Sequence, residues 1–144
     1  MSANLQFRSI ILCDQIRRED NGKALLIGVY SGDIVMQSPA PLALFFYIEC
    51  VGHLDQDEEI TFRINVEKSD GTLATDGRAV LKVEDHMDPV LNLGGAYIFQ
   101  EPGALVLLRE TGNEKWSEIF RKKVSISNPS STEFLSPSGL AQPS

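Results

Sequence analysis

The residues best suited to acid–base or nucleophilic chemistry are few in this sequence: two histidines and two cysteines. His53 lies in "VGHLDQDEE" and His86 in "VEDHMDP", each at the end of an apolar run. A cysteine–histidine pair built from Cys13 or Cys50 needs a thiolate, which burial within a strand disfavours. The chain also has no Gly-x-Ser-x-Gly elbow and no phosphate-binding loop with its lysine. We therefore expect no catalytic residue, and an enzyme is the least favoured of three function classes.

Carboxylates are the second group of side chains that could do chemistry. The segments "DQDEE" and "EDHMD" each gather several acids within a few residues. If these two loops met at one end of a β-sandwich, their oxygens would suit Ca²⁺, with ligands Asp55, Asp57, Asp85 and Asp88. Against this site, "DQDEE" lacks the glycine of an EF-hand turn, and charge runs between strands are usually solvated. A Ca²⁺-dependent binding domain is therefore the alternative hypothesis, and we expect no cofactor.

The charge of the chain is concentrated in its middle. Residues 49–88 contain eleven acidic and four basic residues, so this stretch carries the whole net charge of −7. Such a field repels nucleic-acid phosphates and anionic lipid surfaces. We therefore expect neither nucleic acid nor membrane as a partner. A basic protein or a divalent cation remains compatible with the charge.

The compartment is predicted from apolar runs and cysteine use. The longest apolar run, "PLALFFYI", is far shorter than the ~18 residues of a membrane span. The first fifteen residues show neither the basic segment nor the long apolar segment of a secretory signal. Cys13 and Cys50 lie in apolar runs, and we expect both to be free and buried rather than joined or bound to zinc. These features predict a cytoplasmic protein.

Most of the chain shows the two-residue periodicity of β-strands. "EITFRINVEK" alternates four apolar with four polar residues and predicts a half-buried strand. "RAVLKVED" alternates in the same way. "PLALFFYIECV" is apolar on both parities and predicts a central strand covered on both faces. "PGALVLLRETGNEKWSEIFRKKVSI" predicts a closing hairpin that turns at Gly112 and Asn113, with a bulge or an edge position near Glu118 and Lys122.

These segments predict an all-β fold, an antiparallel β-sandwich of about eight or nine strands that is immunoglobulin-like or C2-like. Residues 1–127 form one domain in this interpretation. Residues 128–144 form a flexible Ser/Pro-rich tail, because the segment from Ser127 onward has six serines, three prolines and a single charge.

The stretch "ILCDQIRREDNGKALLIGVY" combines a cysteine, an aspartate and basic residues, yet it predicts a hairpin rather than a reactive site. Asn21 and Gly22 both tolerate positive φ and form a strong turn signal. The charged residues around them are then a solvated turn. Asp14 is left inside the first strand, where we expect a structural role, by pairing with a nearby base or by accepting backbone N–H groups.

This same stretch, followed by a Pro-rich link and an apolar strand, resembles the opening of a family of small uncharacterised bacterial proteins. The later "EPGALVLLRETGNEKW" and "FRKKVSI" are similar to the closing hairpin of that family. The resemblance spans most of residues 7–126, and its specific part is the first hairpin. It implies a β-sandwich and a cytoplasmic bacterial origin, and it brings no activity or site residue with it.

Together these patterns favour a non-enzymatic protein-interaction module that acts through exposed strands or end loops. Such a module is expected to show a long exposed edge or an apolar patch. The sequence specifies neither the partner nor the oligomeric state.

Overall fold

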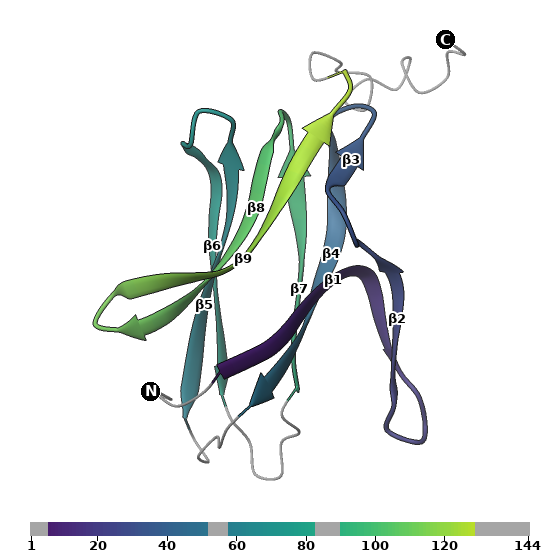
Figure 1. The fold of residues 1–144 in the computed structure, drawn as a ribbon, viewed down its shortest axis with the longest axis vertical. Helices are drawn as coiled ribbons and strands as arrows, with labels where there is room; N and C mark the ends of the chain where they lie inside the picture. Colours follow the sequence, from purple (N-terminus) through teal and green to yellow (C-terminus); the bar gives the residue numbers. More distant parts are fainter. Residues whose placement is uncertain (1–5, 52–57, 83–89, 129–144) are drawn as a thin grey trace.

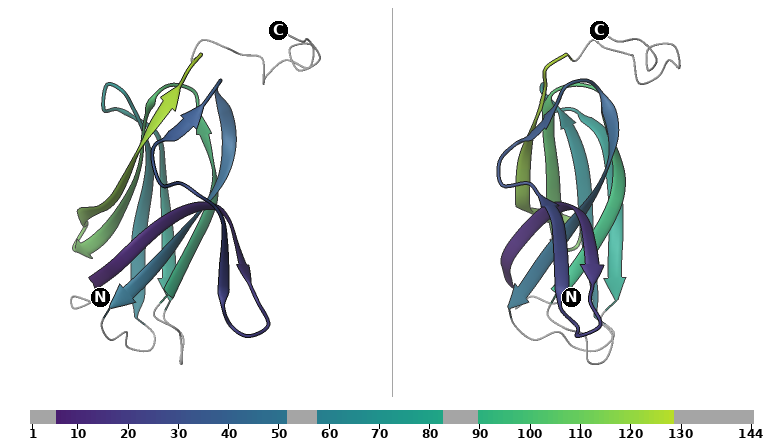
Figure 2. Two further views of the ribbon diagram at one scale, coloured as in Figure 1. Left: turned by 45° about the vertical axis from the view of Figure 1, so that its right-hand side comes forward. Right: turned by 90° about the vertical axis from the view of Figure 1, so that its right-hand side faces the viewer.

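The structure is a computed structural model, and it describes residues 6–51, 58–82 and 90–128. Within these ranges nine strands form two facing sheets, as Figures 1 and 2 show. The strands are β1 (Gln6–Arg18), β2 (Ala24–Val29), β3 (Ile34–Met36), β4 (Ala40–Val51), β5 (Glu59–Lys68), β6 (Leu73–Lys82), β7 (Val90–Phe99), β8 (Gly103–Gly112) and β9 (Lys115–Ile126). The predicted all-β sandwich is confirmed.

The first sheet has the order β2-β1-β4-β7, and the second has the order β3-β9-β8-β5-β6. Neighbouring strands are antiparallel except for β3 and β9, which pair in parallel from Ile34–Val124 to Met36–Ile126. This pair departs from the predicted antiparallel arrangement. Its cause is the chain path, because the segment after β2 crosses from the first sheet to the second and enters β3 in the same direction as β9.

The core lies between the two sheets and follows the predicted alternation. In β4, Leu44, Phe46 and Ile48 are fully buried, and in β5 Phe62 is fully buried in the same way. Phe46 meets Phe120 of β9 edge to face, with ring centroids 5.4 Å apart, which is a favourable aromatic geometry. Side chains of one parity from each sheet thus meet in a single apolar layer.

Two expectations about strand faces are wrong. β4 is central, between β1 and β7, but only one of its faces is fully buried; Phe45 and Tyr47 on the other face are half-buried. Asn65 was expected among the exposed side chains of β5, yet it is only 6% exposed. In register it lies between Asp76 of β6 and Val106 of β8, so it has a neighbouring strand on each side.

The predicted closing hairpin is confirmed. β8 ends at Gly112, and the turn to β9 is Asn113–Glu114, one residue later than predicted; Gly112, Asn113 and Glu114 all have positive φ. The register slips between Leu107 and Leu108, so that Ile119 on β9 is an extra residue, next to the position where a bulge was expected.

No helix among the described residues is long and apolar enough to cross a membrane. The expected Ser/Pro-rich tail lies outside the described residues from position 129 onward.

Candidate interaction surface

The part of the molecule that stands out is the hairpin of β1 and β2. The first half of β1 packs in the sandwich, whereas its second half and β2 project from the body as an arm (Figure 1; Figure 2, left). We call residues 13–30 the β1–β2 arm. The boundary is visible along one face of β1, because Leu12 is 1% exposed and Asp14, two residues later on that face, is exposed. The core therefore ends between Leu12 and Asp14.

Contacts among four residues fix the base of the arm. The Tyr30 hydroxyl donates a 2.6 Å hydrogen bond to Oδ1 of Asp14, and the Tyr30 amide donates a 2.9 Å bond to the Leu12 carbonyl. Gly28 has a φ of +70°, and a Cβ at this position would lie 2.3 Å from Oδ2 of Asp14. Only glycine tolerates both the backbone conformation and the approach of the carboxylate.

This arrangement accounts for Asp14. Its partner is a tyrosine hydroxyl, and the expected pairing with a basic residue is wrong. Burial raises the pKa of Tyr30 to about 12, and the hydrogen bond and negative charge of Asp14 contribute in the same direction. The carboxylate is exposed, so it carries no large desolvation cost.

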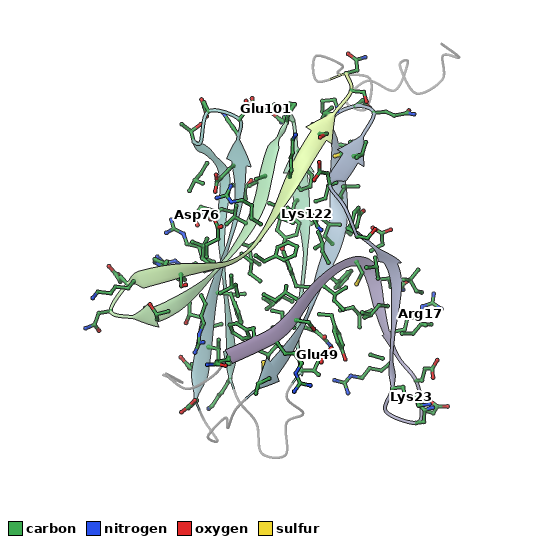
Figure 3. All side chains as sticks on the ribbon, in the orientation of Figure 1. Arg17, Lys23, Glu49, Asp76, Glu101 and Lys122 are labelled. Atoms are coloured by element: carbon green, nitrogen blue, oxygen red, sulfur yellow. The ribbon has the colours of Figure 1, made fainter. Side chains whose placement is uncertain are left out.

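The tip of the arm is a turn over residues 19–23. The Gly22 amide bonds to the Glu19 carbonyl at 3.0 Å, and the Glu19 amide bonds to the Lys23 carbonyl at 2.9 Å. Gly22 has a φ of +82°, whereas Asn21 has none of the positive φ expected for it. The side chain of Asn21 instead accepts a 3.0 Å bond from the Lys23 amide. The loop is therefore a turn that ends in a left-handed glycine, and its charged side chains are solvated as predicted (Figure 3).

β2 is an edge strand whose exposed side chains are largely apolar. β2 pairs with β1 and with no other described strand. Residues 24–30 contain no charged residue. Leu25, Ile27 and Val29 lie on one face of the strand and are 45%, 37% and 51% exposed. Edge strands are commonly protected by charges, prolines or bulges that prevent pairing with another chain, and β2 has no charge or proline to do this.

The opposite edge of the same sheet, β7, shows how different β2 is. β7 is also uncharged and pairs only with β4 among the described strands. Its exposed residues, however, are Asn92, Gly94, Ala96 and a single large apolar residue, Ile98. Its other face contributes Leu91, Leu93 and Phe99 to the core. β7 is thus an edge anchored in the body, whereas β2 exposes large apolar side chains on a projecting arm.

A groove opens between the start of β1 and the β8–β9 hairpin, with a volume of about 460 Å³. Arg109 extends across it, 5.1 Å from the centre of the Phe7 ring. The side-chain oxygen of Ser9 is buried there and has no hydrogen-bond partner within the described part of the chain. Nearby, burial raises the pKa of Cys50 to about 11, so its thiol is not an activated nucleophile. Among the described residues, those that line the groove do not assemble a nucleophile with a base.

A cluster of polar side chains that the sequence did not reveal lies on the outer face of the second sheet. Arg63 and Arg78 are direct cross-strand neighbours, an unfavourable placement for two like charges. Asp76 compensates this repulsion by a bidentate ion pair with Arg63. The centre of the Trp116 ring lies 5.6 Å from the guanidinium carbon of Arg63 and 5.3 Å from that of Arg78. Because these groups bind one another, we interpret the cluster as structural. Only the strand register, which a sequence does not state, brings them together.

The remaining predicted site residues divide into two groups. Cys13 and Cys50 are free and buried, as expected. Cys13 faces Phe45 of β4, and Cys50 lies five residues further along that strand, roughly 16 Å away, which is beyond the reach of a disulfide. The second group lies outside the described residues: His53, His86 and the proposed calcium ligands Asp55, Asp57, Asp85 and Asp88. Within the described ranges no three metal-binding side chains gather.

Comparison with known proteins adds little to this geometry. No protein-family model matches the sequence, and no curated protein matches it. Among solved structures, a β-glucosidase from Listeria innocua in complex with glucose matches at 10% identity and a TM-score of 0.37, over 85% of this chain and 16% of that one. A β-glucosidase from Erythrobacter marinus matches at 10% identity and a TM-score of 0.37, over 84% and 15%. The chain spans about one sixth of those enzymes, and so distant a likeness carries no argument about its function.

Proposed function

We propose that the chain is a non-enzymatic protein-interaction module and that the β1–β2 arm is its binding element. One observation carries this proposal: β2 combines an edge that no other described strand pairs, an uncharged sequence and three exposed large apolar side chains on a segment that projects from the body. An open edge can accept a strand from a partner. Main-chain hydrogen bonds then provide affinity, and alternate side chains provide specificity.

The construction of the arm supports this role. An apolar strand that served only stability would pack on the core, but Leu25 and Val29 lie about half exposed. Burying a Leu, Ile or Val side chain gains about 1.5–3 kcal/mol relative to leaving it in water. The Asp14–Tyr30 hydrogen bond and the Gly28 conformation hold the arm at a defined exit from the sandwich. A preorganised arm loses less entropy on binding than a disordered segment would.

The state of the two thiols, both among the described residues, is compatible with the same role. Burial raises the pKa of both Cys13 and Cys50 and keeps the thiols protonated at neutral pH. Two free buried cysteines also suit a reducing compartment, which supports our inference of a cytoplasmic location.

The test is partner capture with tagged protein in a lysate of the native host, using two matched variants. Ile27→Lys places a charge on the β2 edge, and Ile98→Lys places the same charge on the equally uncharged β7 edge, at a side chain that is 50% exposed. We expect the wild-type protein and Ile98→Lys to retain the same partner and Ile27→Lys to lose it. Equal capture by Ile27→Lys would overturn the assignment of the arm.

A further inference from the structure

We propose that the partner of the β2 edge is β2 of a second copy of this chain, joined to it in antiparallel pairing about Ile27. This inference rests on the proposed function, since it names the partner of the same surface. The paired strands would extend the two four-stranded sheets into one continuous sheet of eight strands.

The first argument is the symmetry of the exposed apolar residues of β2. Residues 24–32 carry no charge, and Ile27 is the middle one of the three exposed large apolar residues, Leu25, Ile27 and Val29. A two-fold axis through Ile27 places Ile27 against its own copy and Leu25 against Val29 of the partner. All of these side chains lie on one face of the sheet and are exposed in the single chain. Aliphatic cross-strand pairs of this kind stabilise antiparallel neighbours.

The second argument is the placement of charge at the two ends of the strand. Lys23 precedes the uncharged segment and Asp33 follows it. Both residues are exposed, and neither forms an ion pair with another described residue. Antiparallel pairing about Ile27 brings Lys23 of one copy opposite position 31 of the other, close to Asp33. A parallel arrangement would instead set lysine beside lysine, so the charge pattern favours the antiparallel one.

The third argument concerns the size of the contact. One six-residue strand on each side buries less than the ~1,200 Å² that stable interfaces usually need. The net charge of −7 on each copy adds a long-range repulsion that salt screens. We therefore expect a weak, reversible dimer that tightens as NaCl is added. A basic partner, which the acidic charge would also attract, would be released by salt.

The decisive measurement is analytical ultracentrifugation of the full chain over a wide concentration range. It is made on the wild-type protein and on variants that carry a positive or a negative charge at position 27. We expect a monomer–dimer equilibrium for the wild-type protein and for Ile98→Lys. Ile27→Lys sets two lysines directly opposite each other and should weaken the dimer about tenfold or more. Ile27→Glu should weaken it likewise. An equimolar mixture of the two variants should recover dimers that contain one chain of each, a rescue that loss of folding cannot produce.

A second variant tests the register. Ile27→Cys should form a disulfide-linked dimer under mild oxidation, because residues facing each other across an antiparallel pair are about 4.5–5.5 Å apart at Cα. The native thiols are buried, and Ile98→Cys is the matched control.

A chain that stays monomeric at every concentration, or a dimer unaffected by Ile27→Lys, would overturn self-pairing. If that monomer still captures a different protein and Ile27→Lys loses it, self-pairing fails and the proposed function stands; if capture is also independent of Ile27, both fail.

Discussion

The hairpin β5–β6 and the hairpin β1–β2 are closed by the same kind of turn, yet one is part of the sandwich and the other projects from it. In the β5–β6 turn the Lys68 amide bonds to the Thr72 carbonyl, the Gly71 amide bonds to the Lys68 carbonyl, and Gly71 has a φ of +86°. Asp70 accepts the Thr72 amide just as Asn21 accepts the Lys23 amide. The two loops are therefore equivalent in their backbone connections.

The difference lies in what covers the strands. β5 is flanked by β6 and β8, and Phe62 is fully buried. Among the described strands β2 is flanked by β1 alone, and its large apolar residues are exposed. A turn signal thus defines a hairpin but does not define its partners. An apolar edge that no second described strand covers is the feature that points to a partner.

The largest expected effect is the difference in unfolding free energy between a truncation in the β5–β6 hairpin and one in the β1–β2 hairpin. Phe62→Ala should lower the free energy of unfolding by about 3–5 kcal/mol, because it opens a cavity in the core beside the Phe7 ring. Ile27→Ala should cost no more than about 0.5 kcal/mol, since it removes an exposed side chain. Urea unfolding of the dilute protein measures both values. Equal losses would mean that the arm packs on the body and would contradict the contrast.

The next effect is at the base of the arm. Gly28→Ala should destabilise the protein by about 1–3 kcal/mol, because the added Cβ requires an unfavourable φ and displaces the Asp14 carboxylate from Tyr30. Gly22→Ala is the matched control, with a similar φ and nothing within 4 Å of the added Cβ. It should cost about 1 kcal/mol. Thermal unfolding compares the variants, and a larger loss for Gly22→Ala would show that the contact with Asp14 is unimportant.

A smaller effect depends on pH. The folded-state pKa of Tyr30 is about 12, above the ~10 of an unfolded tyrosine, so its contribution is fully present below pH 10 and is lost as the pH rises toward 12. We expect about 1 kcal/mol or less, because the pair is partly exposed. Tyr30→Phe should flatten the fall in unfolding free energy between pH 10 and 12. Tyr47→Phe keeps the Asp14–Tyr30 bond and should retain that fall, and identical profiles for the two variants would exclude this coupling.

The smallest expected effect concerns the acidic middle of the chain. If its acids are solvated, millimolar CaCl₂ should raise the melting temperature no more than NaCl of equal ionic strength. A site formed by Asp55, Asp57, Asp85 and Asp88 would instead add RT ln(1 + [Ca²⁺]/Kd) to the free energy of unfolding. A calcium-specific rise that is lost in the Asp57→Asn, Asp85→Asn double variant would favour the calcium hypothesis over the interaction module.

Much of the fold was predictable because strands and turns depend on residues that are close together in the sequence. The alternation of apolar and polar residues in β5 marks a strand with one buried face. Gly22 and Gly71 mark turns, because glycine readily adopts the positive φ found at both positions. What was not predictable depends on contacts between distant residues. Asn65 is buried on a strand that has a neighbour on each side, and the parallel pairing of β3 follows from the chain crossing between sheets.

The candidate surface was predictable only in kind. The sequence led us to expect an exposed edge or an apolar patch, but it marked "ALLIGVY" no differently from a strand that is covered. A structural role was expected for Asp14, but its actual partners, Gly28 and Tyr30, depend on their approach across the arm. The resemblance to a family of small bacterial proteins stays a prediction, because no comparison tests it.

The most direct test of the arm as a binding edge is amide hydrogen exchange, measured for β2 (Ala24–Val29) and β7 (Val90–Phe99) in free and bound protein. The bound state is the concentrated protein or its complex with a captured partner. We predict that amides of β2 facing away from β1 exchange rapidly in the dilute protein and become protected on binding, while those of β7 do not change. Unchanged exchange in β2 in both bound states, or new protection confined to β7, would contradict the account.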